Sequence, residues 1–296
     1  MSNLNKEFQD NLRLILSKGF KKEDRTGVGT ISYPGIMLRH DMSDGFPLLT
    51  LRKIPFKAAA VELEGFIKGI TSKKWYKDRG CNYWNQWCAP YKIPYNTDPD
   101  TKTKMESEDD LGPIYGKQGR EFACYKAIPQ EFGGGVGRTG SKVDQLDNLV
   151  KELKSNPNSR RMLVSYWNPL ANHLMALNPC HTHWQVNVTN NKLNLFYYMR
   201  SVDFILGNNL NSYGLLLHLL AKEAGLEEGV LTGFYADAHV YLDQIDGAKE
   251  ILTRDSSIPL PKVKTENFKS IFDWTSSDSR IIGYNPLPAI KFSVAV

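Results

Sequence analysis

The stretch WQVNVTNNKLNLFYYM, Trp184–Met199, decides how the middle of this 296-residue chain folds. Apolar and polar residues alternate in WQVNVT and again in KLNLFYYM, and Asn190 and Asn191 separate the two runs. Alternation with a period of two is typical of half-buried strands, and an Asn pair suits a tight turn. The stretch therefore predicts a β-hairpin. It also places Cys180, in the preceding segment LNPCHTHWQV, at the start of a strand.

Helical periodicity appears on both sides of this hairpin. The first 20 residues carry Leu and Ile at helical spacing, and SKVDQLDNLVKELKSNPNS predicts a helix with Ser141 as its cap. The apolar segment Ser212–Gly225 predicts a buried helix that ends at Gly225, and an amphipathic helix is expected from about Val240 to Leu252.

The remaining signals are short strands, at Met162–Trp167 and in the tail that follows Pro259 and Pro261. Helices and strands mix without a regular βαβ alternation, and no change of composition marks a linker. We therefore expect an α+β fold in one domain, residues 1–296, with a mixed β-sheet packed by helices.

Two biased segments interrupt this pattern. YNTDPDTKTKMESEDD, Tyr95–Asp110, is polar and charged, and we expect a surface loop within an insertion at about residues 89–110. EFGGGVGRTG, Glu131–Gly140, is rich in glycine but lacks the Lys-Ser/Thr ending of a phosphate-binding P-loop and any strand before it. A flexible turn is the simpler interpretation.

The composition, 41% hydrophobic and 23% charged, is that of a globular chain. No apolar run approaches the roughly 20 residues of a membrane span, and no secretory leader is expected. The net charge of +5 is too balanced for a protein that coats nucleic acid, but it suits one that binds small anions. Four cysteines without a CxxC pair indicate a reducing, cytoplasmic environment.

Cys180 has three interpretations: a metal ligand, an inert buried side chain or a nucleophile. A zinc site needs about four ligands, and we expect His181 to face the opposite side of the strand from Cys180 and His183. The ligand count is therefore too low, and no metal is expected. Most free cysteines are buried and inert. A nucleophilic cysteine acts as the thiolate, which nearby cations favour.

Arginines supply this cationic context. Arg25 lies in EDRTGVGT, Arg160 and Arg161 lie in NPNSRRMLVSYWNP, and Arg200 follows a predicted strand in MRSVD. An Arg pair is often a solvated surface patch, but arginines that end strands beside a cysteine strand are well placed to hold a phosphate. The pattern favours a nucleophilic enzyme that acts on a small phosphorylated molecule.

The chain resembles the thymidylate synthase superfamily, which includes thymidylate synthases and the phage-type deoxypyrimidylate hydroxymethylases. The motifs that carry the resemblance occur in order: DRTGVGT, DGFPLLT, GFIKG, YWNQW, LGPIYGKQ, NPNSRR, LNPCH, RSVD, DAHVY, GYNPLP and the terminal VAV. They span Asp24–Val296, apart from Tyr95–Asp110 and Glu131–Gly140. The resemblance implies a thymidylate-synthase-like domain and a homodimer formed through its sheet.

The resemblance also implies catalytic roles. Cys180 would add to C6 of a deoxypyrimidine monophosphate, which turns C5 into a nucleophile toward the methylene of 5,10-methylenetetrahydrofolate. Glu62 would organise the water that moves protons, with Tyr115 and His181 nearby. His181 has a second interpretation, because a residue after a catalytic cysteine often only forms a structural hydrogen bond.

Binding residues follow from the same motifs. Those implied for the nucleotide are Arg25, Arg160, Arg161, Arg200, Ser201, Asp203, Asn209, Asn211, His239 and Tyr241. Arg160 and Arg161 would reach the phosphate from a second subunit, and His239 and Tyr241 would hold the ribose. Those implied for the folate are Arg52, Trp84, Asp203, Leu206, Gly207 and Val296. Neither nucleic acid nor a membrane is expected as a partner.

One departure bears on the base. Synthases carry a segment of the kind LG-x-PFN-x-x-SY, whereas this chain has LGNNLNSY, two residues shorter. Alignment from SY makes Asn209 the base-reading residue, and alignment from LG makes it Asn211. Either amide can match O4 and N3–H of uracil, where the deoxycytidylate enzymes carry an acid. We therefore expect dUMP rather than dCMP as the substrate.

Other departures bear on the product. Met199-Arg200-Ser201 and Glu62-Leu63-Glu64 resemble the hydroxymethylases, whereas Trp84, Tyr115, Leu177 and Val296 are retained from synthases. The outcome depends on whether water reaches the exocyclic methylene. We expect a deoxyuridylate hydroxymethyltransferase, with a thymidylate synthase as the alternative. A dCMP hydroxymethylase, a non-catalytic nucleic-acid-binding relative and a structural or metal-binding protein are the further alternatives.

Overall fold

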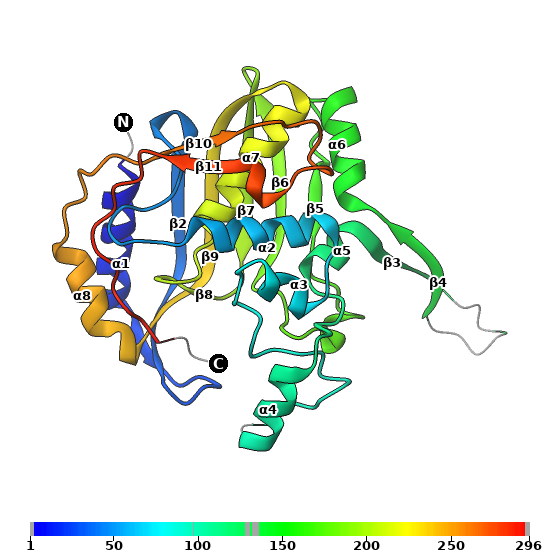
Figure 1. Cartoon of the computed structure of the whole chain (residues 1–296), viewed down its shortest axis with the longest axis horizontal. Helices are drawn as coiled ribbons and strands as arrows, with labels where there is room; N and C mark the ends of the chain where they lie inside the picture. Colours follow the sequence, from blue (N-terminus) through cyan, green and yellow to red (C-terminus); the bar gives the residue numbers. More distant parts are fainter. Residues whose placement is uncertain (1–2, 97, 128–130, 132–135, 294–296) are drawn as a thin grey trace.

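The structure is a computed structural model that describes residues 3–96, 98–127, 131 and 136–293. Within these residues helices cover a mixed β-sheet (Figure 1). The helices are α1 (Leu4–Lys18), α2 (Phe56–Lys68), α3 (Lys73–Asp78), α4 (Pro99–Ser107), α5 (Tyr115–Glu121), α6 (Gln145–Ser155), α7 (Leu210–Ala224) and α8 (Ile245–Thr253). The strands are β1 (Phe20–Lys22), β2 (Thr30–Asp41), β3 (Phe122–Ala127), β4 (Val136–Val143), β5 (Leu163–Ser165), β6 (His181–Thr189), β7 (Lys192–Met199), β8 (Val202–Asp203), β9 (Glu227–Tyr241), β10 (Lys262–Thr265) and β11 (Ser279–Ile282).

The large sheet has the order β1-β2-β9-β7-β6-β5, and the short β8 extends β7 along the edge of β9. Strands β7 and β9 run parallel and the other neighbours on this path run antiparallel, so the sheet is mixed, as expected. Two smaller sheets pair β10 with β11 and β3 with β4, and the β3–β4 ribbon projects from the body beside α5 (Figure 1).

The predicted hairpin is confirmed by the pairing of β6 with β7. Its turn residues Asn190 and Asn191 have φ of 51° and 60°, a left-handed pair that Asn tolerates better than most residues. Cys180 directly precedes β6, as predicted. The hairpin therefore carries Cys180 at one end of a strand, with Arg200 directly after the partner strand.

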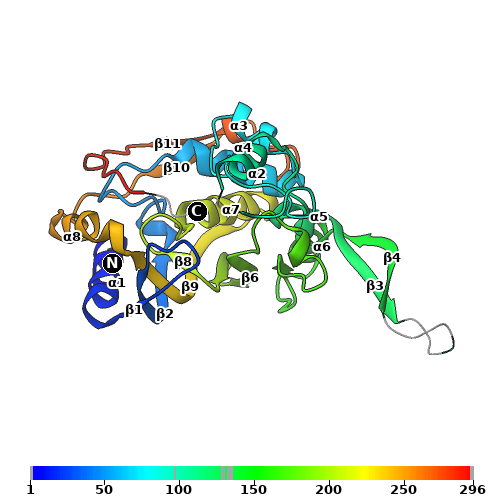
Figure 2. The ribbon, with the colours of Figure 1, turned by 90° about the horizontal axis from the view of Figure 1, so that it is seen from below.

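Helix α7 confirms the buried helix expected at Ser212–Gly225, and it ends where Gly225 takes the left-handed conformation. Helices α7 and α2 lie on one side of the sheet (Figure 2). On that side β7 buries Leu193, Leu195, Tyr197 and Met199, while its opposite side chains are only partly buried. One face of the sheet therefore forms the core, and the described residues leave the other face open.

Two expectations about where helices begin are wrong. The helix predicted from Ser141 begins at Gln145, because Asp144 caps it by accepting from the N–H of Asp147, and Ser141 lies in β4. The helix predicted from Val240 begins at Ile245, because β9 continues to Tyr241.

The two biased segments also differ from expectation. Tyr95–Asp110 contains helix α4, capped by Asp98 and anchored by the buried Met105, so it is not simply a loop. In Glu131–Gly140 residues 136–140 belong to β4 rather than to a flexible turn, and residues 132–135 lie outside the described residues.

No helix in the described part of the chain combines the length and apolar character that a membrane span requires.

Candidate active site

Cys180 lies at the junction of Pro179 and β6, partly buried against the core. Its backbone N–H donates to the Tyr115 hydroxyl at 2.8 Å, and its carbonyl accepts from the N–H of Arg200 at 2.9 Å. Both backbone groups of Cys180 are therefore fixed by neighbours from α5 and from the end of β7. This arrangement holds the thiol in one place.

The charge state of the Cys180 thiol reflects opposing influences. Burial raises its pKa, whereas the positive charge of Arg200 and a hydrogen bond from Tyr115 lower it. Burial dominates, so the thiol is protonated in the free protein at neutral pH. Arg200 and Tyr115 are the groups that stabilise a thiolate when one forms.

His181 is buried beneath this cysteine in an aromatic cage. Its ring stacks on Tyr115 with centroids 4.2 Å apart, and its Nδ1 shares a hydrogen bond of 2.7 Å with the Tyr213 hydroxyl. Burial lowers the pKa of His181 to about 3, so the imidazole is neutral at physiological pH. A neutral, hydrogen-bonded ring suits a positioning role better than proton transfer.

His183 lies on the other face of the sheet from His181, where its ring stacks on Tyr198 at 5.4 Å. The expected opposition of the two histidines is confirmed, but for a different reason. Strict alternation would place residues two apart on one face, and an irregularity between His181 and His183 in the β6–β7 register shifts the pattern. Among the described residues no group of three His, Cys, Asp or Glu is arranged to hold a metal.

Glu62, on α2, is the most strongly perturbed carboxyl beside the cysteine. Its Oε1 accepts a hydrogen bond of 3.0 Å from the indole Nε1 of Trp84, and burial raises its pKa to about 7. The charges of Glu62 and Cys180 both raise the pKa of Tyr115, so the three groups lie close together. A carboxyl with a pKa near 7 can both take up and release a proton at neutral pH.

Arg200 is held by the loop that precedes Cys180. Its Nε donates to the Pro179 carbonyl and its terminal nitrogen to the Asn178 carbonyl, both at 2.9 Å. Arg25 is exposed on the β1–β2 loop, 5.8 Å from the ring centre of Trp87. This loop is closed by Asp24, which accepts from the N–H groups of Thr26 and Gly29.

The end of β9 brings a second set of expected residues to the cysteine. The charges of Asp203, Arg25 and Cys180 all influence the pKa of the Tyr241 phenol. These side chains therefore lie around one region. His239 lies beside Asp203 in the β8–β9 register, and its Nδ1 is 3.2 Å from Asp237, which leaves the other ring nitrogen for a ligand. Ser201 is partly buried between Arg200 and β8.

Asp203 closes the loop that leads into α7. Its Oδ1 accepts from the N–H groups of Ile205 and Leu206 at 3.0 Å, and its Oδ2 accepts from Gln244 at 2.8 Å. Burial nevertheless raises the pKa of Asp203. Gly207 then donates its N–H to the Asp203 carbonyl at 2.7 Å. The loop is therefore compact, although Leu206 itself remains 36% exposed.

The three asparagines after Gly207 have different surroundings. The side chain of Asn208 is buried and bonds to the Phe204 carbonyl and the Leu210 N–H. Asn211 accepts from the N–H of Ser212 within α7. Asn209 adopts φ of 54°, makes no capping bond to α7, and its amide forms no hydrogen bond among the described residues. Of these three side chains, only the Asn209 amide forms no hydrogen bond at all among the described residues, whereas the Asn211 oxygen is already used.

The residues expected to meet a folate have different surroundings. Trp84 is buried beside Glu62, and Leu206 presents an apolar side chain. Arg52 donates to the Ile205 carbonyl at 2.9 Å, which places a guanidinium next to Leu206. Val296 lies outside the described residues.

Arg160 and Arg161 are not tied to this cluster. Both are exposed before the edge strand β5, and neither has an ion-pair partner in the part of the chain that the structure describes. The sequence pattern did not indicate Tyr213 or Asp237, the partners of His181 and His239, because each contact depends on chain segments that only the fold brings together.

These groups define one kind of chemistry: a thiol beside a cation, a carboxyl with a pKa near 7, a free amide, and arginines suited to an anion. A family model for thymidylate synthase matches residues 6–296. The chain therefore belongs to the thymidylate synthase family, whose members transfer a one-carbon group from methylenetetrahydrofolate to deoxyuridylate.

Proposed function

We propose that this protein is a deoxyuridylate hydroxymethyltransferase, which converts dUMP to 5-hydroxymethyl-dUMP and releases tetrahydrofolate. The choice of dUMP is supported by one observation above the others, the unbonded amide of Asn209 in the loop between Asp203 and α7. An amide held in one orientation can donate to O4 and accept from N3–H, the pattern of a uracil edge, whereas cytosine presents the reverse pattern and would need the amide turned over. We propose that Asn209, rather than Asn211, reads the base.

Covalent activation begins at Cys180. The thiolate forms a bond to C6 of the pyrimidine, and the electron pair of the C5–C6 double bond moves to C5 and O4. Arg200 and the Tyr115 hydroxyl stabilise the thiolate that attacks, because both lower the pKa of the thiol against the effect of burial. His181 keeps Tyr115 in place through ring stacking.

Phosphate and ribose binding follow from the surrounding residues. Arg25, Arg200 and Ser201 would hold the phosphate, and bidentate arginine contacts give such a site both charge and geometry. His239, oriented by Asp237, would donate to or accept from the ribose hydroxyl together with Tyr241. These residues act by binding and orienting the nucleotide over Cys180.

Methylenetetrahydrofolate supplies the one-carbon unit as a co-substrate. Arg52, Trp84, Asp203, Leu206, Gly207 and Val296 are the residues that we propose to hold it. C5 would form a bond to the methylene carbon, and Glu62 would remove the C5 proton through water as the bonds from that carbon to the folate nitrogens break and tetrahydrofolate leaves. The pKa of Glu62, about 7, allows it to exchange protons at neutral pH. The indole of Trp84 fixes the Glu62 carboxyl by its hydrogen bond.

The product depends on what adds to the exocyclic methylene at C5. In a hydroxymethylase a water oxygen forms the new bond, a proton is lost, and the bond from Cys180 to C6 breaks. The short Asp203–Leu210 loop with its exposed Leu206 supports water entry. The alternative is thymidylate synthesis, in which tetrahydrofolate delivers a hydride to the methylene and leaves as dihydrofolate. The buried Trp84 and Tyr115 favour this alternative because they exclude water.

We further propose a homodimer formed through the open face of the sheet. Met37, Phe234, Tyr198 and His183 form a row of directly paired residues across β2, β9, β7 and β6. Met37 is 47% and Phe234 40% exposed, and a hollow of about 310 Å³ is lined by the three residues of this row other than Met37, together with their neighbours on β6 and β7. Exposed apolar surface of this kind marks an interface. Arg160 and Arg161 would cross it to the partner's phosphate site.

One assay tests the proposed function. The protein is incubated with methylenetetrahydrofolate and either dUMP or dCMP, and the nucleotide and folate products are identified. Conversion of dUMP, with little conversion of dCMP, and release of tetrahydrofolate support the proposal. Preferred turnover of dCMP would contradict the role of Asn209, and dihydrofolate formation would establish the synthase alternative. We also propose that the enzyme acts as one catalytic domain in the cytoplasm.

A further inference from the structure

Two buried tyrosine hydroxyls converge on the backbone of the base-reading loop. The Tyr197 hydroxyl, from β7, donates to the Asn208 carbonyl at 2.8 Å, and the Tyr235 hydroxyl, from β9, approaches the same oxygen at 3.1 Å. The two hydroxyl oxygens are 2.5 Å apart. Both rings are 1% exposed, so no solvent shares these contacts.

The arrangement satisfies both phenols around a single acceptor. The two hydroxyls have two protons for three short contacts: one from each hydroxyl to the Asn208 carbonyl and one between the hydroxyls. One phenol therefore always donates to Asn208, and the other donates either to Asn208 or to the first phenol. A buried hydroxyl without a partner costs a few kcal/mol. The loop conformation that keeps the Asn208 carbonyl within reach of the two hydroxyls is therefore favoured. The pair therefore fixes one peptide group from two strands at once.

The neighbouring strand leaves room for the pair. Gly233 is the register partner of Tyr197, and a Cβ at this position would lie 2.6 Å from both hydroxyl oxygens. A side chain there would push the two hydroxyls away from Asn208. The glycine is therefore part of the same structural feature, since it gives the two phenols the space in which they meet.

Fixing the Asn208 carbonyl constrains Asn209. The carbonyl of one residue and the N–H of the next lie in a single planar peptide unit, so a bond to the Asn208 oxygen orients the backbone at which Asn209 begins. Asn209 holds an uncommon left-handed conformation, φ 54°, and its own side chain contributes no capping bond to hold it. The surroundings must then impose this conformation.

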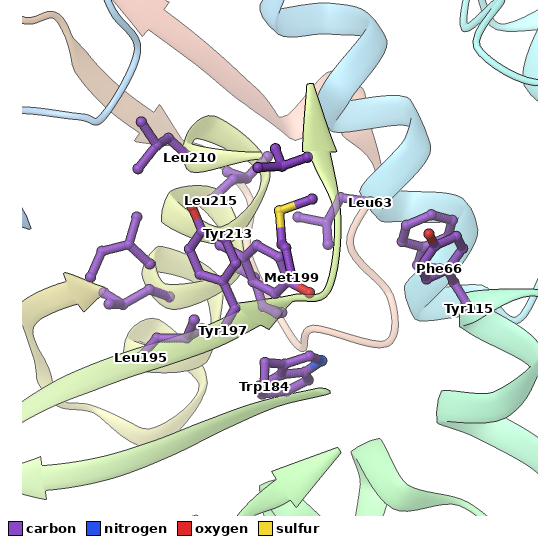
Figure 3. Packing of buried hydrophobic residues seen from close by; sticks show 14 of the residues in the cluster. Leu63, Phe66, Tyr115, Trp184, Leu195, Tyr197, Met199, Leu210, Tyr213 and Leu215 are labelled. Atoms are coloured by element: carbon purple, nitrogen blue, oxygen red, sulfur yellow. The ribbon is translucent and has the colours of Figure 1, made fainter. Parts of the chain in front are cut away.

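The hydroxyl pair is also connected to the reactive cysteine. The ring of Tyr197 stacks on Tyr213 with centroids 4.1 Å apart (Figure 3), and the Tyr213 hydroxyl bonds to His181 beside Cys180. This second connection depends on the rings of Tyr197 and Tyr213, whereas the connection to Asn208 depends on the hydroxyls of Tyr197 and Tyr235. A Tyr-to-Phe change separates the two.

We propose that the Tyr197–Tyr235 hydroxyl pair is a positioning element that holds Asn209 where its amide discriminates a uracil edge from a cytosine edge. This inference rests on the proposed function, because it assumes that Asn209 reads the base. The two tyrosines do not touch the substrate. They act through the Asn208 carbonyl, which lies in the loop between Asp203 and α7.

The test measures base discrimination in Tyr197→Phe, Tyr235→Phe and the double variant. Binding of dUMP and of dCMP is measured by calorimetry, together with KM and kcat for dUMP. A matched control is Tyr76→Phe, which removes another buried phenol that donates to a backbone carbonyl, that of Ile70. The thermal unfolding midpoint of each variant separates loss of stability from loss of selectivity.

We expect the dUMP-to-dCMP affinity ratio to fall about tenfold in the double variant, the effect of losing one orienting hydrogen bond. The KM for dUMP should rise while kcat stays close to that of the unmodified enzyme, because the aromatic stack is kept. Tyr76→Phe should retain the ratio. If the double variant does not fold, the single variants answer the question, since each removes one of the two donors.

An unchanged ratio in the folded double variant would overturn the inference and leave the proposed function intact. Where the double variant does not fold, an unchanged ratio in both single variants would do the same, because each single variant weakens the hold on the Asn208 carbonyl. Failure of the unmodified enzyme to bind dUMP in preference to dCMP would overturn the proposed function, and the inference with it.

Discussion

The Tyr115 hydroxyl accepts a hydrogen bond from the backbone N–H of Cys180 at 2.8 Å, while its own proton remains available for the thiol. One phenol therefore both fixes the backbone of the cysteine and stabilises its thiolate. The His181 ring stacks on the ring of Tyr115, so the residue that follows the cysteine helps to hold Tyr115 in place. The predictions below follow from this geometry.

Cys180→Ala should abolish turnover and preserve dUMP binding, because the change removes the atom that bonds to C6 but none of the groups that hold the phosphate. Steady-state assays and calorimetry measure the two effects separately. Cys124→Ala is the matched control, since Cys124 lies on β3 away from this cluster, and it should keep full activity. Retained turnover in Cys180→Ala would refute covalent activation.

Tyr115→Phe should slow alkylation of Cys180 by iodoacetamide at neutral pH. Burial already raises the pKa of this thiol, and the change removes a hydrogen bond that lowers it, so the pKa should rise further. The alkylation rate is measured against pH in both proteins, with Cys180→Ala to correct for other thiols. An unshifted profile would show that Tyr115 acts only on the backbone.

Glu62→Gln should lower kcat by about a hundredfold or more, as expected for loss of a general acid–base group. In the unmodified enzyme the rate should change with an apparent pKa near 7, because burial raises the pKa of Glu62 to about 7. The residual activity of the variant should lack that transition. A pH–rate profile that keeps the transition in Glu62→Gln would assign it to another group.

Stability should depend on the same carboxyl. The pKa of Glu62 is about 7 in the folded protein and near its ordinary value of about 4.5 in the unfolded chain. The protonated carboxyl is therefore tolerated at full stability below pH 4.5, and this stability is lost as the pH rises through 7. Glu62→Gln should therefore gain stability relative to the unmodified protein across this range, by up to about 3 kcal/mol. Urea unfolding at several pH values measures it, and a constant difference would contradict the burial argument.

The homodimer can be tested by complementation. Neither Cys180→Ala nor the double variant Arg160→Ala/Arg161→Ala should be active alone, but their mixture, once subunits exchange, should regain about a quarter of full activity. One mixed site would then combine an intact cysteine with intact arginines from the partner. Absence of recovery after demonstrated subunit exchange would place these arginines outside the partner's site.

Phe234→Arg should separate the subunits, because it places a charge in the centre of the open face of the sheet. Sedimentation or light scattering reports the mass. Ile282→Arg serves as the control, since Ile282 has a similar exposure, 41% against 40%, but lies on β11 outside the large sheet. Dissociation by both changes, or by neither, would argue against this face as the interface.

Local periodicity was enough to predict the β6–β7 hairpin and α7, because each has a regular pattern within one short segment. It did not indicate β9, because buried and exposed residues do not alternate regularly along this strand. It also placed the starts of two helices too early, since Asp144 caps α6 and β9 extends into the expected helix at Val240.

The site also has features that local sequence predicts and features that depend on distant residues. The motif around Cys180 and the arginine at the end of β7 are local in sequence, and the structure places them together. The partners that set their properties are distant: Tyr115 is 65 residues from Cys180, and Tyr213 is 32 from His181. Only the fold distinguishes Asn209 from Asn211, because the difference lies in which amide is already bonded.

The central claim is that water, rather than hydride, meets the carbon installed at C5 of dUMP. The most direct measurement is the mass of the nucleotide formed from dUMP and methylenetetrahydrofolate in water enriched in oxygen-18. We predict 5-hydroxymethyl-dUMP that carries the heavy oxygen, without formation of dihydrofolate. A methylated nucleotide without the isotope, formed together with dihydrofolate, would contradict the claim and identify the enzyme as a thymidylate synthase.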